Sequence, residues 1–332
     1  MADHSLLGLR DISHRFGERA PSVVDRLLGR APRPGKVTHA VNHVDLDVRA
    51  GEVVGLVGES GCGKSTLGRI AAGLIRPSEG SVEVDGVTIA GMDAEQARRT
   101  RLRVQMIFQD PYASLNPRRR IMDAVGEAVR VHRIVPPAEV DAYVCHQLER
   151  AGLDPALRGR YPHQFSGGQR QRIGIARALA VRPDMLVCDE AVAALDVSIQ
   201  AQVLNVFMDL REQLNLTYLF ISHDLGVVEH LSDRVVVMYL GRVVETAPVR
   251  ELYDHPAHPY TQALLAEVPR IDVRHKRFST IRGEIPSPLN PPSGCHFHPR
   301  CPFATERCRL EVPVLKPVGG GHFSACHLNE GH

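Results

Sequence analysis

Apolar positions along the chain follow two patterns. Short continuous apolar runs predict buried strands at residues 6–12, 37–48, 53–57, 185–188 and 218–221. One stretch from residue 196 onward instead repeats apolar residues at helical spacing, and these are Ile199, Val203, Val206, Phe207, Leu210 and Leu214. Strand and helix patterns alternate, which predicts an α/β fold with helices covering the sheet.

Two regions depart from this alternation. Between about Pro117 and Pro183 the strand pattern disappears and helical composition predominates, which predicts a helical subdomain at 117–183 inserted between sheet strands. From about Pro256 onward, Pro, His and Cys accumulate; the Pro-rich segment 286–308 cannot continue a sheet and marks an accessory extension. We therefore predict a main domain at 1–255 and an extension at 256–332. An Arg-, Pro- and Gly-rich insertion at 17–36 is expected to be a solvated loop.

Composition narrows the class of protein. A chain of 332 residues with 43% hydrophobic and 23% charged residues has room for one large core and an appended region. With 40 Lys and Arg against 38 Asp and Glu, no general basic field indicates binding to nucleic acid. No apolar run reaches membrane-spanning length and no export signal opens the chain, so we expect it in the cytoplasm with reduced cysteines.

Residues 58–65, GESGCGKS, match the phosphate-loop pattern GxxxxGK[ST] between a predicted strand and a predicted helix. Glycines let main-chain N–H groups converge on phosphate oxygens, and the following helix adds positive potential at its start. Lys64 would neutralise the β- and γ-phosphates and the Ser65 hydroxyl would ligate Mg²⁺. The predicted nucleotide contacts in this loop are Gly58, Ser60, Gly61, Cys62, Gly63, Lys64, Ser65 and Thr66. The Cys62 side chain needs no chemical role.

A second acidic motif follows the strand at 185–188. Asp189 and Glu190 stand at its carboxyl end, where a ligand beside the phosphate loop would lie. Asp189 suits the Mg²⁺ shell, and Glu190 suits a general base that polarises the attacking water. We therefore predict hydrolysis of a nucleoside triphosphate.

The residues Phe165-Ser166-Gly167-Gly168-Gln169, followed by RQRIGIARALA, resemble the signature LSGGQ of the ABC ATPase family. Phe replaces Leu, an apolar exchange that we expect to be harmless. Ser166 and the N–H groups of Gly167 and Gly168 would open a helix and form a second anion site. The resemblance implies that this site meets the γ-phosphate held by the opposite subunit, so one chain supplies half of each composite site.

Other family positions appear in order. Gln109 in IFQDP resembles the Q-loop glutamine, Asp196 in AALD the D-loop aspartate, and His223 in FISHD the switch histidine. The resemblance implies that Gln109 senses Mg²⁺ and contacts a membrane subunit, and that His223 binds the γ-phosphate and orients the water. Phe16 is the candidate for stacking on adenine. The stretch 189–196 departs from the family pattern at two positions, where Ala replaces the usual Pro and Ser. Neither position is that of the predicted base.

Over nearly its whole length the chain resembles ATPase subunits of oligopeptide/dipeptide permeases, through VGESGCGKST, ALDVSIQAQ and HPYTQALLAEVP. That resemblance implies an ATP hydrolase that energises import of di- or oligopeptides, peripheral at the cytoplasmic face of the membrane. Its expected partners are a second, non-identical ATPase subunit, two membrane permease subunits and an extracytoplasmic binding protein, but no nucleic acid. The alternatives are import of another solute, such as nickel complexes, or a soluble ABC ATPase outside transport.

Four cysteines lie in the Pro-rich extension at Cys295, Cys301, Cys308 and Cys326. Four thiolates suit either tetrahedral Zn²⁺ or an iron–sulfur cluster, and the residues alone do not choose between them or exclude a metal-free segment. Relatives with such an extension carry a [4Fe-4S] cluster, so the resemblance favours a cluster with a structural role. Further candidate ligands are His296, His298 and His327. Cys145 and Cys188 are expected to be ordinary buried thiols.

Overall fold

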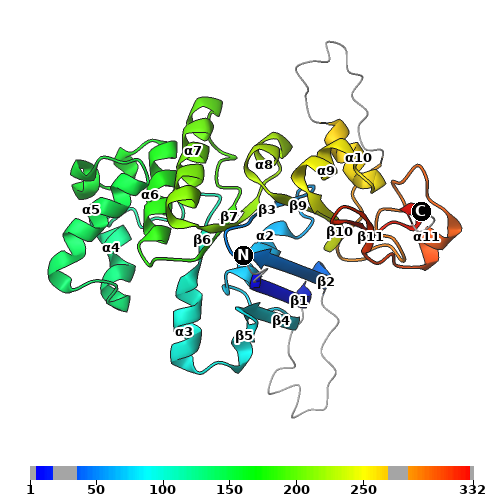
Figure 1. Cartoon of the computed structure of the whole chain (residues 1–332), viewed down its shortest axis with the longest axis horizontal. Helices are drawn as coiled ribbons and strands as arrows, with labels where there is room; N and C mark the ends of the chain where they lie inside the picture. Colours follow the sequence, from blue (N-terminus) through cyan, green and yellow to red (C-terminus); the bar gives the residue numbers. More distant parts are fainter. Residues whose placement is uncertain (1–4, 18–35, 268–282, 330–332) are drawn as a thin grey trace.

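The computed structural model describes residues 5–17, 36–267 and 283–329 (Figure 1). The predicted loop at 17–36 lies almost wholly outside these residues. An eight-stranded sheet runs through the middle of the fold in the order β11-β12-β10-β9-β3-β8-β7-β6. Its parallel strands are β3 (Val53–Val57), β6 (Val104–Ile107), β7 (Met185–Asp189), β8 (Thr217–Ile221) and β9 (Arg234–Tyr239). Its antiparallel strands are β10 (Arg242–Pro248), β11 (Lys316–Gly319) and β12 (His322–Ser324).

The centre of this sheet is covered on both faces, which explains why β3, β7 and β8 read as continuous apolar runs. In β8, Tyr218 and Phe220 face a core formed with α7 (Val197–Leu214), where Phe207 meets both rings edge to face. Leu219 and Ile221 face the opposite core, which includes α2 (Lys64–Ala71). Side chains therefore alternate between two cores along one strand.

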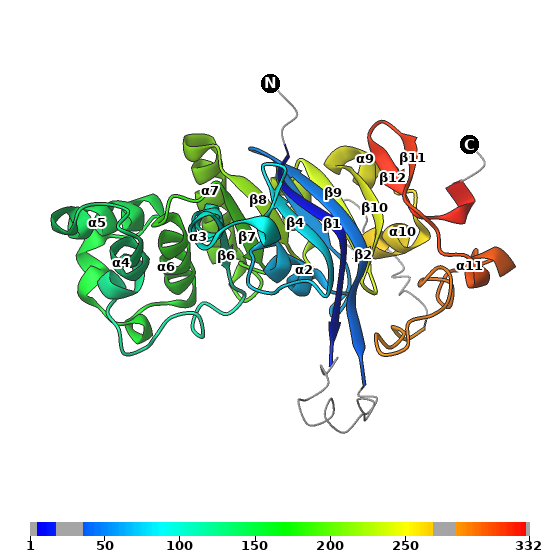
Figure 2. The ribbon, with the colours of Figure 1, turned by 90° about the horizontal axis from the view of Figure 1, so that it is seen from below.

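A second sheet packs beside the first and is antiparallel, in the order β2-β1-β4-β5 (Figure 2). Its strands are β1 (Ser5–Phe16), β2 (Thr38–Arg49), β4 (Glu79–Val84) and β5 (Val87–Thr88). Apolar residues of β1 and β2 share the core on the α2 side of the central sheet. Helix α3 (Ala94–Arg103) follows this sheet in the chain, whereas α8 (Leu225–Leu231) packs on the opposite face of the central sheet, with Val227 in the same core as α7.

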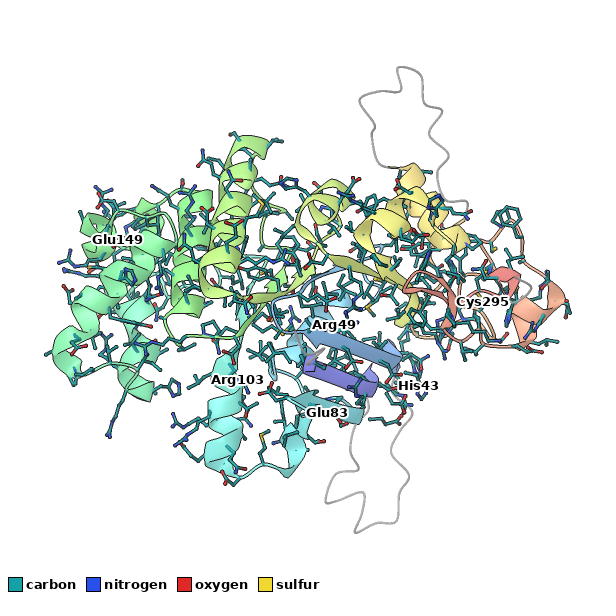
Figure 3. The ribbon with its side chains drawn as sticks, viewed as in Figure 1. His43, Arg49, Glu83, Arg103, Glu149 and Cys295 are labelled. Atoms are coloured by element: carbon teal, nitrogen blue, oxygen red, sulfur yellow. The ribbon has the colours of Figure 1, made fainter. Side chains whose placement is uncertain are left out.

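The residues between β6 and β7 are helical in the structure. They form α4 (Ile121–His132), α5 (Val140–Arg150) and α6 (Gly167–Leu179), which pack through a common apolar core. Short 3-10 turns lie at η1 (Ile89–Gly91), η2 (Pro137–Glu139), η3 (Pro155–Gly159), η4 (Pro162–Gln164) and η5 (His327–Asn329). The subdomain boundaries 117–183 stay a prediction. Figure 3 places Glu149 of α5 and Cys295 at opposite ends of the molecule.

Helix α9 (Val249–Asp254) lies just before the predicted boundary, and the extension contains α10 (Pro259–Ala266) and α11 (Glu306–Leu310). The Pro-rich segment 286–308 adds no strand, but the hairpin β11–β12 that follows pairs with β10 and lengthens the sheet. The hairpin escaped prediction because its strands have only 4 and 3 residues, which is too short for a clear alternation. Among the described residues, no helix is long and apolar enough to cross a membrane.

Candidate nucleotide-binding site

The loop between β3 and α2 has the backbone that a phosphate site requires. Gly58, Gly61 and Gly63 adopt φ values of 148°, 78° and 106°, a region that favours glycine. A Cβ atom on Gly63 would lie 2.1 Å from the carbonyl oxygen of Ala40, so no other residue fits there. Gly63 also precedes α2 without a side-chain cap, which leaves the first N–H groups of the helix for a ligand.

Lys64 lies folded over this loop. Its side chain is buried, and Nζ donates to the main-chain oxygens of Gly58 at 2.7 Å and Glu59 at 3.0 Å. Neither acceptor is a carboxylate, so the lysine charge is not neutralised by these two contacts. It remains to be balanced by an anionic ligand.

Ser65 and Asp189 meet behind the loop, as a shared cation site requires. The Ser65 hydroxyl donates to Asp189 Oδ1 at 2.8 Å. Burial raises the pKa of Asp189, and the hydrogen bond from Ser65 opposes that shift only in part. A divalent cation would favour the ionised carboxylate, so these two oxygens fit Mg²⁺ in their donor chemistry.

Glu190 joins two of the other predicted residues. Gln109 Nε2 donates to Glu190 Oε2 at 2.6 Å, and His223 Nδ1 lies 3.5 Å from Glu190 Oε1. Glu190 has φ 48°, and its N–H donates to the carbonyl oxygen of Ile221 on the neighbouring strand. A non-glycine residue in this left-handed conformation is held there by its surroundings, which is common at functional sites.

A cavity of about 310 Å³ lies between the phosphate loop, Gln109 and Glu190, whereas Asp189 and His223 do not line it. It is lined by Phe16, Thr38, Ala40, Ser60, Gly61, Gly63, Lys64, Ser65, Thr66, Gln109, Glu190 and Pro288. Most of these residues were predicted from the sequence, including Phe16, which is 43% exposed. Thr38, Ala40 and Pro288 were missed: the first two lie in β2 opposite the loop, and no motif marks Pro288 in the extension. The predicted contacts Gly58 and Cys62 do not line the cavity, and the Cys62 side chain is buried.

The predicted signature residues form a separate site at the start of α6. The Ser166 hydroxyl accepts from Gln169 N–H at 3.3 Å, and Gln169 Oε1 accepts from Ser166 N–H at 3.0 Å. This reciprocal capping box fixes the helix start, and Phe165 packs in the core beside it. Gly167 and Gly168 begin the helix, and Asp196 is exposed immediately before α7. None of these residues lines the cavity at the phosphate loop.

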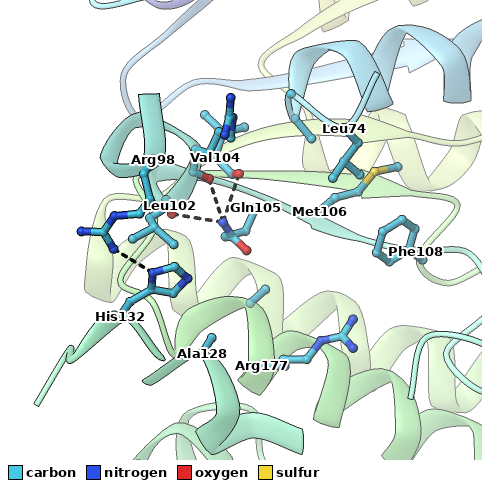
Figure 4. Close-up of a pocket in the computed structure, with 14 residues that line it drawn as sticks. Leu74, Arg98, Leu102, Val104, Gln105, Met106, Phe108, Ala128, His132 and Arg177 are labelled. Carbon is cyan, nitrogen blue, oxygen red and sulfur yellow. Dashed lines mark hydrogen bonds between the residues drawn. The ribbon is translucent and has the colours of Figure 1, made fainter. Parts of the chain in front are cut away.

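A second cavity of about 460 Å³ lies between the α3–β6 segment and the helices α4 and α6 (Figure 4). Apolar side chains on the α3–β6 side include Leu102, Val104 and Phe108, the last directly before Gln109. Cationic groups stand at its edges, where Arg98 Nη1 lies 2.9 Å from His132 Nδ1. No sequence motif marks this cavity, because its two sides come from separate elements.

The four extension cysteines are all free thiols. Cys295 N–H donates to the carbonyl oxygen of Cys308 at 2.8 Å, and burial raises the pKa of Cys326 to about 11. In residues 5–17, 36–267 and 283–329, however, no group of three or more His, Cys, Asp or Glu is arranged to hold a metal ion. The predicted iron–sulfur or zinc site is therefore not confirmed.

The three histidines considered as additional ligands each face a main-chain oxygen. His296 Nδ1 lies 3.0 Å from the oxygen of Leu240, and His298 Nδ1 lies 3.0 Å from that of Cys295. His327 Nε2 lies 3.1 Å from the oxygen of Glu311. The first contact joins the extension to the turn between β9 and β10, and the other two join residues within the extension.

Comparison with known proteins agrees with this arrangement. Residues 41–193 match the family model described as ABC transporter, and residues 244–308 match the oligopeptide/dipeptide transporter C-terminal region. The chain is 49% identical over 329 residues to the oligopeptide transport ATP-binding protein AppF of Bacillus subtilis (strain 168), covering 98% of this chain and 97% of AppF. The chain belongs to the ABC transporter family. Within that family it is an ATP-binding subunit of the oligopeptide/dipeptide group.

Further relatives support the same placement of this ABC ATPase. It is 50% identical over 292 residues to the di/tripeptide transport ATP-binding protein DppF of Pseudomonas aeruginosa (strain UCBPP-PA14), covering 88% of this chain and 90% of DppF. Among solved structures, the ATP-binding cassette MJ0796, dimeric and bound to ADP and Pi, matches with a TM-score of 0.62 at 25% identity. That match covers 74% of this chain and 99% of MJ0796. The ABC ATPase fold is therefore established.

Proposed function

We propose that this ABC ATPase hydrolyses ATP to energise the import of di- or oligopeptides by a membrane-bound transporter. The observation that carries the proposal is the cavity that brings Lys64, Ser65, Gln109 and Glu190 together at the start of α2. Support for the peptide substrate comes from relatives named for oligopeptide and di/tripeptide transport.

In this proposal the residues divide the work of hydrolysis. Loop N–H groups and Lys64 bind the phosphates, while Ser65 and Asp189 hold Mg²⁺, which neutralises charge on the transferred phosphoryl group. Glu190 Oε1 accepts the proton of the attacking water. Gln109, at 2.6 Å from the other carboxylate oxygen, orients Glu190, and His223 is near enough to place the water. Phe16 stacks on the adenine.

The signature residues act on a second subunit. Ser166 to Gln169 lie outside the cavity of their own chain, so their N–H groups serve the nucleotide of a partner ATPase subunit, with Asp196 at the same interface. The dimeric MJ0796 structure supports such a pairing. We propose that the partner is a second, non-identical subunit of the same group.

The membrane subunits contact the second cavity. Its apolar lining and cationic edges suit an amphipathic segment that carries acidic groups, and Phe108 links it directly to Gln109. In this proposal the ATPase lies at the cytoplasmic face of the membrane, beneath two permease subunits served by an extracytoplasmic binding protein. The test is ATP-dependent peptide uptake by vesicles that contain the complete complex. Uptake of another solute but no peptide would contradict the substrate, and absence of membrane subunits from the purified complex would contradict the transport role.

We also propose a structural metal centre at Cys295, Cys301, Cys308 and Cys326, a [4Fe-4S] cluster rather than Zn²⁺. The proposal rests on four free thiols in a segment with few apolar residues, and the thiols would have to converge when the metal binds. Anaerobic purification followed by iron, sulfide and zinc analysis tests it. Stoichiometric zinc, or no metal, would contradict the cluster.

A further inference from the structure

Glu59 is the second residue of the phosphate loop, and every polar group of this residue is engaged. Its carbonyl oxygen accepts from Lys64 Nζ at 3.0 Å. Its N–H donates to the hydroxyl oxygen of Tyr260 at 2.9 Å, and both carboxylate oxygens accept from Arg300. Two of these three partners belong to the C-terminal extension, which therefore reaches the loop that binds phosphate.

Arg300 makes the most restrictive of these contacts. Its Nη1 and Nη2 donate to the two carboxylate oxygens of Glu59 at 2.7 and 3.0 Å, a geometry that fixes the carboxylate in both position and orientation. Only 9% of Arg300 is exposed, and its guanidinium lies over the ring of Tyr239 at 5.8 Å from the centroid. Without this partner, a carboxylate in the phosphate loop would repel a nucleoside triphosphate. Arg300 thus neutralises a charge that the loop itself carries.

Tyr260 is held as firmly. Its side chain is fully buried, and its ring packs against Tyr239 and Phe297 at centroid distances of 4.7 and 5.4 Å. The hydroxyl is therefore aimed at the Glu59 N–H by packing as well as by its hydrogen bond. The extension also reaches the other side of the cavity, where Pro288 accepts from His39 N–H at 3.0 Å and contributes to the lining.

We propose that the extension completes the nucleotide site of its own chain, with Arg300 and Tyr260 as positioning residues that hold the phosphate loop through Glu59. Pro288 forms part of the cavity wall on the Phe16 side. The proposal rests on ATP binding at this cavity, and it adds that nucleotide affinity depends on a segment outside the ATPase motifs. It does not depend on a metal at the cysteines.

The experiment measures MgATP affinity of the purified full chain and the KM and kcat of the assembled complex. Arg300→Gln leaves the Glu59 charge unbalanced beside the triphosphate, so we expect the Kd and KM for MgATP to rise about tenfold or more, with kcat changed much less. Arg300→Lys restores part of the affinity because it returns the charge without the bidentate geometry. Tyr260→Phe keeps the packed ring and raises Kd by a smaller factor. Arg307→Gln, which breaks an exposed pair with Glu311 in the same extension, is the matched control and leaves Kd unchanged.

A double variant separates a positioning role from simple loss of structure. If Arg300 acts by balancing Glu59, then Glu59→Gln combined with Arg300→Gln binds MgATP more tightly than Arg300→Gln alone. Thermal unfolding without nucleotide shows whether each variant is folded. Wild-type affinity in folded Arg300→Gln, or no recovery in the double variant, would overturn the inference. Lys64→Ala tests the nucleotide site itself, and MgATP binding retained by this variant would contradict the proposed function. If Lys64→Ala loses MgATP binding but Arg300→Gln binds like the wild type, only the role of the extension is contradicted.

Discussion

Two helices of this ATPase begin with glycine-rich segments, and their N-termini differ in almost every respect that matters to an anion. The start of α2 has no side-chain cap, contains the buried Lys64 and opens into a cavity shared with Gln109 and Glu190. The start of α6 is closed by the capping box of Ser166 and Gln169 and does not line that cavity.

A helix N-terminus needs additional groups before it forms a complete anion-binding site. Both helices supply positive potential at their first turn, but that contribution is worth only about 0.3–1 kcal/mol at an exposed position. At α2 a lysine, a cation site and the cavity walls are added by the same chain. At α6 the chain adds only its own cap, so this terminus is expected to bind nucleotide only when a second subunit brings the phosphates to it.

The largest effect is expected from Lys64→Ala. It removes the charge that distinguishes α2 from α6, and we expect MgATP affinity to fall at least a hundredfold because a charge-assisted contact with phosphate is lost. Isothermal titration of the full chain measures this. Arg99→Ala removes an exposed cation from α3 and is expected to bind like the wild type. Equal losses in both variants would mean that net charge, not the loop, controls affinity.

Glu190→Gln separates binding from chemistry at the α2 site. The variant keeps the shape of the side chain but cannot accept a proton, so we expect turnover in the assembled complex to fall by about 10²–10⁴ while MgATP binding is retained. Steady-state phosphate release is the measurement. Glu212→Gln, an exposed change on α7, serves as the control. A wild-type rate in Glu190→Gln would exclude this residue as the base.

Gly168→Ala tests the α6 site. The added Cβ would lie 2.2 Å from Ile199 Cγ2, so the start of α6 must shift against α7. We expect turnover of the assembled complex to fall about tenfold while MgATP affinity of the isolated chain stays the same. Gly174→Ala in the same helix has open space around its Cβ and is the control. Weaker MgATP binding by the isolated Gly168→Ala chain would contradict the division between the two sites.

The smallest expected effect is a pH dependence of the free energy of unfolding, caused by two buried histidines in the extension that supports α2. Burial lowers the pKa of His258 to about 4 from its usual 6.5, and the same cause lowers the pKa of His296 to about 4. As pH falls, these histidines are protonated in the unfolded chain before they are protonated in the folded chain. Their contribution to the free energy of unfolding is therefore fully present above pH 6.5 and is lost as pH falls toward 4. For each histidine the loss between pH 7 and 5.5 is about 1 kcal/mol.

Thermal unfolding at a series of pH values measures this effect. His258 Nδ1 accepts from Tyr260 N–H, and His258→Asn keeps an acceptor while removing the titrating ring, so its midpoint should depend less on pH. His255→Asn changes an exposed histidine and should keep the wild-type slope. The same slope in His258→Asn would contradict the assignment.

Sequence reasoning located the α2 site because its residues fall in local motifs with their own chemistry. The residues Lys64, Ser65, Asp189 and Glu190 could be assigned because each follows a recognisable strand. The contact between Glu59 and Arg300 could not be found in this way, because 241 residues separate the partners and neither belongs to a motif that names the other. Pro288 was missed for the same reason, since a composition rich in proline says nothing about what the segment touches.

The fold, like the site, was predictable where the sequence pattern is local. Strands with continuous apolar runs were identified, whereas the β11–β12 hairpin was not, since Phe323 is its one aromatic residue and is 39% exposed. The four cysteines of the extension show a different limit of prediction from sequence. Their number predicts a ligand set, but their spacing does not determine whether the folded chain brings the sulfur atoms together.

The hairpin also bears on how far this protein can be shortened. Glu245 of β10 is completely buried, and its carboxylate meets His322 Nε2 of β12 at 2.6 Å and the N–H groups of Ala257 and His258. A chain ended after residue 255 would leave this carboxylate without those three partners and β10 as an uncovered edge strand, open to pairing with other molecules. The boundary that separates the ATPase motifs from the extension in the sequence is therefore not a place where the folded protein can be divided.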